Sequence, residues 1–208
     1  VVFPNEREAE LFYDDISLCT GDVCFIPDWN TLPYRSERPG SQICGKRVKA
    51  LTRLVSGAKC IAVTSVRTLL TPMAPADFFK RHISLLKRGQ GINTAELEAM
   101  MQQCGYIRTP KVSVPGDFAI RGEVFDFYPF GSDEPVRAFF DFDEIEHIKT
   151  FNPFTQASTG ELERVVIPPC REILWDPEHI EAVKRLGFLK EGALENLETE
   201  NEVAEEEY

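Results

Sequence analysis

The sequence has 208 residues and a formal net charge of −11. This length allows one large domain or two small ones, and 43% hydrophobic residues suffice for a substantial core. No run of about 18 apolar residues occurs, so we expect no helix that spans a membrane. The acidic balance argues against a domain that holds DNA or RNA mainly by its phosphates.

The first 70 residues alternate between apolar runs and helical periodicity. Three segments have the pattern of buried strands: Val1–Phe3, residues 23–26 and residues 60–66. Asn5 and Glu8 form a capping box before a helix, and a second helix follows Ile43 and ends at Gly57. This alternation of three strands with two helices predicts an α/β fold with a parallel sheet. Because the chain starts within an apparent strand, we expect a fragment of a longer protein.

The pattern changes after a short helix at 67–70. We expect a strand and a glycine turn in residues 82–92, then a helix that Asn93 and Glu96 cap and Gly105 ends. Further strands are predicted near 106–114, 117–128, 136–142 and 146–151, which together describe a compact α+β module. Val165–Pro168 is a last apolar strand with the potential to rejoin the first sheet, and residues 176–186 are expected to form a helix.

These patterns predict three regions. They are an α/β portion at 1–82, an inserted α+β module at 83–165, and a segment at 166–208 that returns to the α/β portion. Residues 191–208 contain eight Glu and no Lys or Arg. We interpret them as a solvated tail, with a specific acidic binding arm as the alternative.

The sequence offers little chemistry. Six cysteines lack any C-x-x-C spacing, and the three histidines are distant from one another, so we expect no metal site and reduced thiols in a cytoplasmic protein. Residues 40–47 fit G-x-x-x-x-G-K, but Arg47 replaces the hydroxyl residue and no buried strand precedes them. Lys46 and Arg47 are interpreted as solvated helix residues. We expect no catalytic residues and no cofactor.

Residues 136–142 show the most informative alternation. Ala138, Phe140 and Phe142 are predicted to fill the core of the module, whereas Arg137, Phe139 and Asp141 form a stripe on the opposite face if no bulge intervenes. An arginine beside an exposed aromatic side chain is typical of protein interfaces. Arg121, on the neighbouring strand, has the potential to join this stripe. From the pattern alone, a second element of the same chain covering this face is an equally good interpretation.

Residues 116–163 resemble two related families, UvrB of nucleotide excision repair and the N-terminal region of the bacterial transcription-repair coupling factor (Mfd). The similarity rests on IRGEVFDFYP, R-x-F-F, DEIE and FNPFTQAS, and it extends to about Trp175. UvrB carries a tyrosine-rich DNA-binding hairpin before the proline-rich loop. Here residues 23–51 pass directly from strand to loop to helix, and DWNTLPY looks like the coupling factor.

The resemblance implies a RecA-like portion interrupted by a module that binds UvrA and so recruits repair proteins to stalled RNA polymerase. ATP, magnesium, polymerase and DNA would be bound by other parts of the full-length protein, an ATP-dependent DNA translocase. The family's UvrA-contact residues match Arg121 and Arg137. The alternative is a fragment of an ATP-dependent UvrB-type excinuclease subunit that binds damaged DNA.

This sequence departs from the family in the stripe itself. The relatives have arginine, acid and phenylalanine at alternate positions, whereas here the order is Arg137, Phe139 and Asp141. Two explanations remain open. The contacts are rearranged on the same face, or a bulge shifts the strand and turns Phe140 or Phe142 outward. The expected UvrA-binding residues are therefore Arg121, Arg137, Phe139, Phe140 and Asp141.

Overall fold

The computed structural model describes residues 1–31, 40–172, 174, 181 and 185. The chain divides into two units, Val1–Glu172 and Ile173–Tyr208, and the first is described below. It combines helices with a parallel three-stranded sheet, a mainly antiparallel six-stranded sheet and an antiparallel strand pair, as the sequence predicts for an α/β protein with an α+β module. The predicted helix at 176–186 and the acidic tail at 191–208 lie outside the described residues, apart from the single positions 181 and 185.

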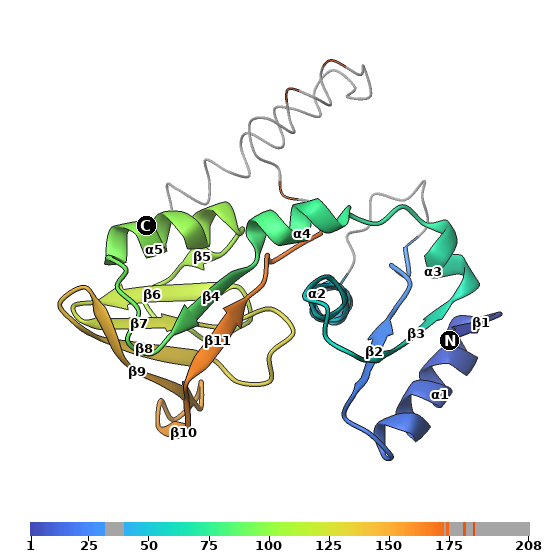
Figure 1. Cartoon of the computed structure of the whole chain (residues 1–208), viewed down its shortest axis with the longest axis horizontal. Coiled ribbons are helices and arrows are strands. Elements are labelled where there is room, and N and C mark those ends of the chain that lie inside the picture. Colours follow the sequence, from blue (N-terminus) through green and yellow to red (C-terminus); the bar gives the residue numbers. More distant parts are fainter. Residues whose placement is uncertain (32–39, 173, 175–180, 182–184, 186–208) are drawn as a thin grey trace. The chain divides into compact units, whose positions relative to one another are not determined.

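The N-terminal portion is a three-stranded parallel sheet. Its order is β1 (Val2–Phe3), β3 (Ile61–Ser65), β2 (Val23–Ile26), so the chain reverses direction across the sheet after β2. With right-handed crossovers this reversal places α1 (Glu6–Ser17) and α2 (Ser41–Val55) on opposite faces, as Figure 1 shows. The predicted alternation of strands and helices is thereby confirmed.

Local capping explains where α1 begins. The Asn5 side chain accepts a hydrogen bond from the Glu8 backbone N–H at 2.9 Å and donates to the Glu8 carboxylate at 2.7 Å. The apolar stripe of α1 packs on the sheet around buried Ala9, Phe25 and Val63. Two short helices follow β3: α3 (Val66–Leu70), close to the expected 67–70, and α4 (Ala76–His82), which the sequence did not predict.

The module contains a six-stranded sheet in the order β10-β9-β8-β7-β6-β5. All its neighbours are antiparallel except β5 and β6, which run parallel. The strands are β5 (Ile107–Arg108), β6 (Asp117–Arg121), β7 (Val124–Phe127), β8 (Val136–Asp141), β9 (Glu144–Phe151) and β10 (Ser158–Leu162).

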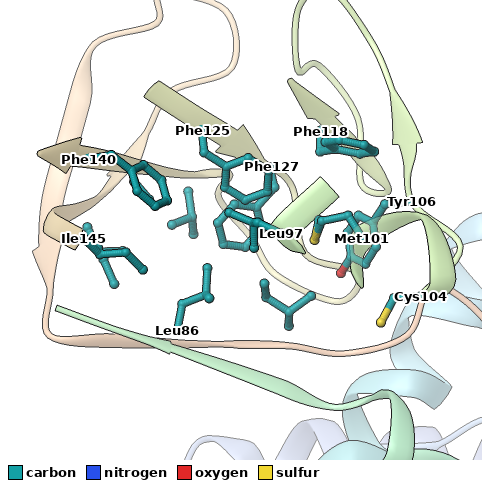
Figure 2. Close-up of a cluster of buried hydrophobic side chains, with 14 of the residues drawn as sticks. Leu86, Leu97, Met101, Cys104, Tyr106, Phe118, Phe125, Phe127, Phe140 and Ile145 are labelled. Atoms are coloured by element: carbon teal, nitrogen blue, oxygen red, sulfur yellow. The ribbon is translucent and has the colours of Figure 1, made fainter. Parts of the chain in front are cut away.

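The core of the module lies against one face of this sheet. Helix α5 (Thr94–Gln103), which Asn93 caps as predicted, and the antiparallel pair β4 (Ser84–Lys87) and β11 (Arg164–Ile167) complete it. Figure 2 shows phenylalanines of the sheet meeting aliphatic and sulfur-containing side chains of α5 and β4. The labelled members are Leu86, Leu97, Met101, Cys104, Tyr106, Phe118, Phe125, Phe127, Phe140 and Ile145.

Three expectations about strands are corrected. Residues 117–128 are a hairpin and not a single strand, because Gly122, at a φ of 59°, turns the chain between β6 and β7. Phe142 is not in the core: it follows the end of β8 at a φ of 53° and its side chain is 89% exposed. β11 pairs with β4 and not with the first sheet. The return of residues 166–208 to the α/β portion as a whole stays a prediction.

The expectation that Arg47 is a solvated helix residue is also wrong, because its side chain is fully buried. Its guanidinium donates to both carboxylate oxygens of Glu172, at 2.5 and 3.2 Å, and to the backbone carbonyl of Pro27 at 2.5 Å. It also stacks over the ring of Trp29, with 4.1 Å between the guanidinium carbon and the ring centroid. This buried ion pair links α2 to the residues that follow β11.

Candidate functional site: the outer face of the six-stranded sheet

The outer face is the side of the six-stranded sheet that points away from the core in Figure 2. Strand pairing places its side chains in two rows. Ala119, Asp126, Arg137 and Lys149 are successive register partners in one row, and Arg121, Val124, Phe139 and His147 are partners in the next. Because side chains alternate along a strand, the core phenylalanines between these residues point the other way.

Asp126 is the centre of this face. Its carboxylate is 1% exposed and accepts hydrogen bonds from Nε and Nη2 of Arg137 at 2.6 and 2.9 Å. It also accepts one from Nη2 of Arg121 at 2.5 Å. A buried carboxylate needs such partners. One negative charge is thus shared by two guanidinium groups, which leaves a local excess of one positive charge.

The two arginines differ in exposure. Arg137 is 16% exposed: it also donates to the backbone O and to Oε1 of Gln156, at 3.4 and 3.1 Å, and lies over the ring of Phe151. Its hydrogen bonds to Asp126 raise the pKa of the Arg137 guanidinium above its usual value. Arg121 is 50% exposed, and its hydrogen bond to Asp126 involves only Nη2, which leaves the other guanidinium edge available. Arg121 is therefore the member of the pair that presents its charge outward.

The second row is partly apolar. Phe139 is half-buried on the outer face, and Nζ of Lys149 lies 5.6 Å from its ring centroid. Beside it, Nδ1 of His147 and Oε1 of Glu161 are 2.9 Å apart. This hydrogen bond to His147 lowers the pKa of Glu161. One half-buried aromatic ring therefore lies in the same row as Arg121, and charged side chains surround it on its far side.

The predicted site residues occupy different positions. Arg121 and Arg137 come together through Asp126, and Phe139 lies on the same face, as expected. Asp141 is exposed at the end of β8, where it pairs with Glu144. Phe140 is 4% exposed and belongs to the core, as the alternation predicts, so the alternative in which a bulge turns it outward as a contact residue is wrong. A bulge does exist, but the extra residue is in β9. Phe139 pairs with His147, whereas the next residue of β8, Phe140, pairs with Ile145.

The sequence interpretation missed two members of the site, Asp126 and Gln156. Asp126 is an acid between core phenylalanines in the strand VFDF, where an isolated charge is unusual. That signal, combined with two arginines on neighbouring strands, points to a buried ion pair. No unusual charge marks Gln156 in the sequence. Its contact with Arg137 depends on a turn in which Gln156 has a positive φ of 62°.

Within the described residues, no group of three or more His, Cys, Asp or Glu side chains is arranged to hold a metal ion. None of the helices described is long and apolar enough to cross a membrane. In the segment that resembles a P-loop, Gly40 is the N-cap of α2, and the Arg47 side chain forms an ion pair with Glu172.

Part of the chain matches a known domain family. Residues 85–172 match the family model of the UvrB interaction domain, and this range contains all the residues of the outer face. The class of module that the fold presents is therefore that of a UvrB interaction domain.

Most of the chain is similar to one segment of transcription-repair-coupling factors. Identity is 32% over 182 residues with the protein of Haemophilus influenzae, covering 87% of this chain, and 30% over 185 residues with that of Borreliella burgdorferi, covering 88%. The Escherichia coli protein is 30% identical over 182 residues. The chain spans 16% of the length of each of these three relatives. The family resemblance seen in the sequence is thus confirmed.

Proposed function

We propose that this chain is the UvrA-binding, repair-recruiting region of a transcription-repair coupling factor, and that the outer face is its UvrA-binding surface. In the full-length protein it would connect a stalled RNA polymerase to the excision machinery. The observation that carries the proposal is the pair of guanidinium groups that buried Asp126 holds on one side of a UvrB interaction domain.

The physical basis is preorganisation. Arginine and aromatic side chains supply most of the binding energy in many interfaces, and fixing them beforehand lowers the entropy lost on association. Asp126 fixes both arginines before any partner arrives, and Arg121 keeps a half-exposed guanidinium in the same row as Phe139, with Val124 between them. Such a surface suits a protein partner with a complementary carboxylate.

We further propose that this region binds no nucleotide and hydrolyses no ATP, and that ATP and magnesium belong to a motor elsewhere in the full-length protein. Direct binding of duplex DNA is disfavoured by the net charge of −11. An ATPase assay of the purified chain, with and without DNA, tests the first statement: hydrolysis above the protein-free rate would contradict it. A salt-sensitive, submicromolar gel shift would contradict the second.

Titration calorimetry of the 208-residue chain against UvrA from the same organism tests the main proposal. We expect wild-type binding and a loss of at least about tenfold in affinity for Arg121→Ala, because its exposed guanidinium edge is removed. Arg108→Ala is the matched control. Arg108 is 54% exposed and also paired, with Glu98 at 2.7 Å, but it lies on the core side of the sheet edge, opposite Phe118.

Each result has a distinct meaning. No binding by the wild-type chain would overturn the proposed function. Binding that Arg121→Ala and Arg108→Ala leave equally unchanged would overturn the assignment of the surface only. Arg137→Glu is a poorer test than it seems from the sequence, because it sets a second carboxylate against buried Asp126 and so disturbs the fold itself.

A further inference from the structure

Two phenylalanines in the described part of the chain are almost fully exposed. Phe142 is 89% exposed and Phe154 is 88% exposed. They lie in the turns at opposite ends of β9, Phe142 just before it and Phe154 just after it. Burying a phenylalanine side chain would contribute about 1.5–3 kcal/mol, so two turns that each leave one in water require an explanation.

The turn that carries Phe154 is held by its own hydrogen bonds. The backbone N–H of Asn152 donates to Ala157 at 2.9 Å, and that of Gln156 donates to Asn152 at 2.8 Å. The Asn152 side chain accepts from the N–H groups of Phe154 and Thr155 at 2.9 and 3.0 Å. Phe154 is therefore presented by a closed, ordered turn, which is the preorganisation that a contact residue needs.

The same turn is attached to the arginine cluster. Gln156 adopts a φ of 62°, and its backbone O and Oε1 both accept from the Arg137 guanidinium. The Gln156 side-chain amide in turn donates to Pro153 at 2.8 Å. Asp126, Arg137, Gln156 and the Phe154 turn thus form one continuous hydrogen-bonded unit. The turn lies at the end of the outer face away from Phe139, since Arg137 pairs with Lys149 and Phe139 with His147.

From this continuity we propose that Phe154 is a principal aromatic contact of the UvrA-binding surface, flanking the arginine pair on the side opposite Phe139. The proposal rests on the proposed function and extends the surface beyond the strands to the β9–β10 turn. It requires a partner surface with an apolar pocket for Phe154 and a carboxylate within reach of Arg121. Sequence alternation in β8 cannot reveal this residue, because Phe154 belongs to neither of the alternating rows.

Phe142 provides the contrast. It lies between Asp141, Asp143 and Glu144, and its turn is attached to the β4–α5 connection, where Ile92 N–H donates to Asp143 O at 2.8 Å. Among the residues that the structure describes, the partners of Asp126 and Arg137 do not include any residue of that turn. Exposure and residue type are the same at both positions, so the two phenylalanines differ mainly in their connection to the arginine cluster.

The test compares Phe154→Ser with Phe142→Ser in the 208-residue chain, by calorimetric titration against UvrA from the same organism. We expect Phe154→Ser to weaken binding at least about tenfold and Phe142→Ser to change it less than about twofold. Phe154→Leu should restore most of the affinity, since it returns an apolar side chain. Both serine variants should keep the wild-type melting temperature, because each removes an exposed side chain.

The outcomes separate the inference from the function on which it rests. If wild-type and Phe154→Ser chains bind UvrA equally while Arg121→Ala weakens binding, the surface stands and the role of Phe154 is wrong. Equal losses for Phe154→Ser and Phe142→Ser would also overturn it, since the effect would then follow exposure and not position. Absence of binding by the wild-type chain would remove the proposed function, and the inference with it.

Discussion

The buried carboxylate of Asp126 holds the guanidinium of Arg137 through two hydrogen bonds of 2.6 and 2.9 Å. The two residues are register partners on adjacent strands β7 and β8, so the pair crosses the middle of the sheet. A charge pair at this position serves two purposes at once. It makes burial of a carboxylate possible and it fixes the direction in which the arginine points.

Asp126→Asn should destabilise the protein by about 3 kcal/mol, because the two guanidinium groups lose the charge that compensates them. The measurement is urea unfolding followed by circular dichroism. Asp133→Asn is the control: Asp133 is exposed, and its contact with Lys49 is 4.0 Å long, so we expect a change within about 0.5 kcal/mol. Similar small effects for both variants would show that the pairing contributes little to stability.

Replacing each arginine by alanine should separate folding from binding. Arg137→Ala removes two of the three hydrogen bonds to Asp126 and should cost about 2–3 kcal/mol of unfolding free energy. Arg121→Ala should cost less than about 1 kcal/mol, because half of that side chain is in water. Thermal and urea unfolding measure both. A larger loss for Arg121→Ala than for Arg137→Ala would contradict the arrangement described.

Gly131→Ala should be more destabilising than Gly122→Ala. Both glycines have a positive φ, 73° and 59°, so both substitutions strain the backbone by about 1 kcal/mol. At Gly131, however, an added Cβ would lie 2.7 Å from Cβ of Lys49 and 2.8 Å from the carbonyl O of Gly45, both on α2, whereas Gly122 has open space. We expect a further 1–2 kcal/mol at Gly131 from this overpacking. Equal melting temperatures for the two variants would exclude a close contact with α2.

Alkylation should distinguish the thiols. Burial raises the pKa of Cys104 to about 11, and burial together with the hydrogen bond to Cys60 raises the pKa of Cys24 to about 12. Only the thiolate reacts, so iodoacetamide at pH 8 should modify exposed Cys19 and spare Cys24 and Cys104 in the native chain. Peptide mass spectrometry reports each site, and denatured protein provides the control.

The pH dependence has a definite sign. The native pKa of Cys104 lies above the unfolded value of 9.0, so the unfolded thiol loses its proton first as pH rises. The contribution of this thiol to stability is therefore complete below pH 9 and declines between pH 9 and about 11. Native-state alkylation of Cys104 as fast as that of Cys19 at pH 8 would contradict its burial.

Local signals in the sequence were enough to predict most elements. The capping residues Asn5 and Asn93 begin α1 and α5 as expected, because capping depends only on neighbouring residues. Periodicity alone reads residues 117–128 as one strand, because the apolar pattern continues on both sides of Gly122, where the chain turns from β6 into β7. Helix α4 was missed because it is short and lies between a proline-rich segment and a strand.

The site was less predictable, for a physical reason. The alternation of side chains correctly predicted that Arg137 and Phe139 share the outer face. It wrongly predicted Phe142 in the core, because an alternating pattern does not show that β8 ends in a turn before Phe142. The role of Asp126 as an ion-pair partner can be recognised only when the pairing of β7 with β8 is known, because that pairing sets Asp126 opposite Arg137. Contacts of this kind depend on register between strands, which a single sequence does not specify.

The pairing of Arg47 with Glu172 has a consequence for synthesis. The two residues are 125 positions apart, and both are buried in the finished protein. At typical translation rates Arg47 leaves the ribosome on the order of ten seconds before its partner. Until then its guanidinium has to stay hydrated, since burying it alone would be unfavourable. Helix α2 therefore reaches its final depth only after the strands of the module have been made, and a nascent chain that stops before residue 172 should remain incompletely packed.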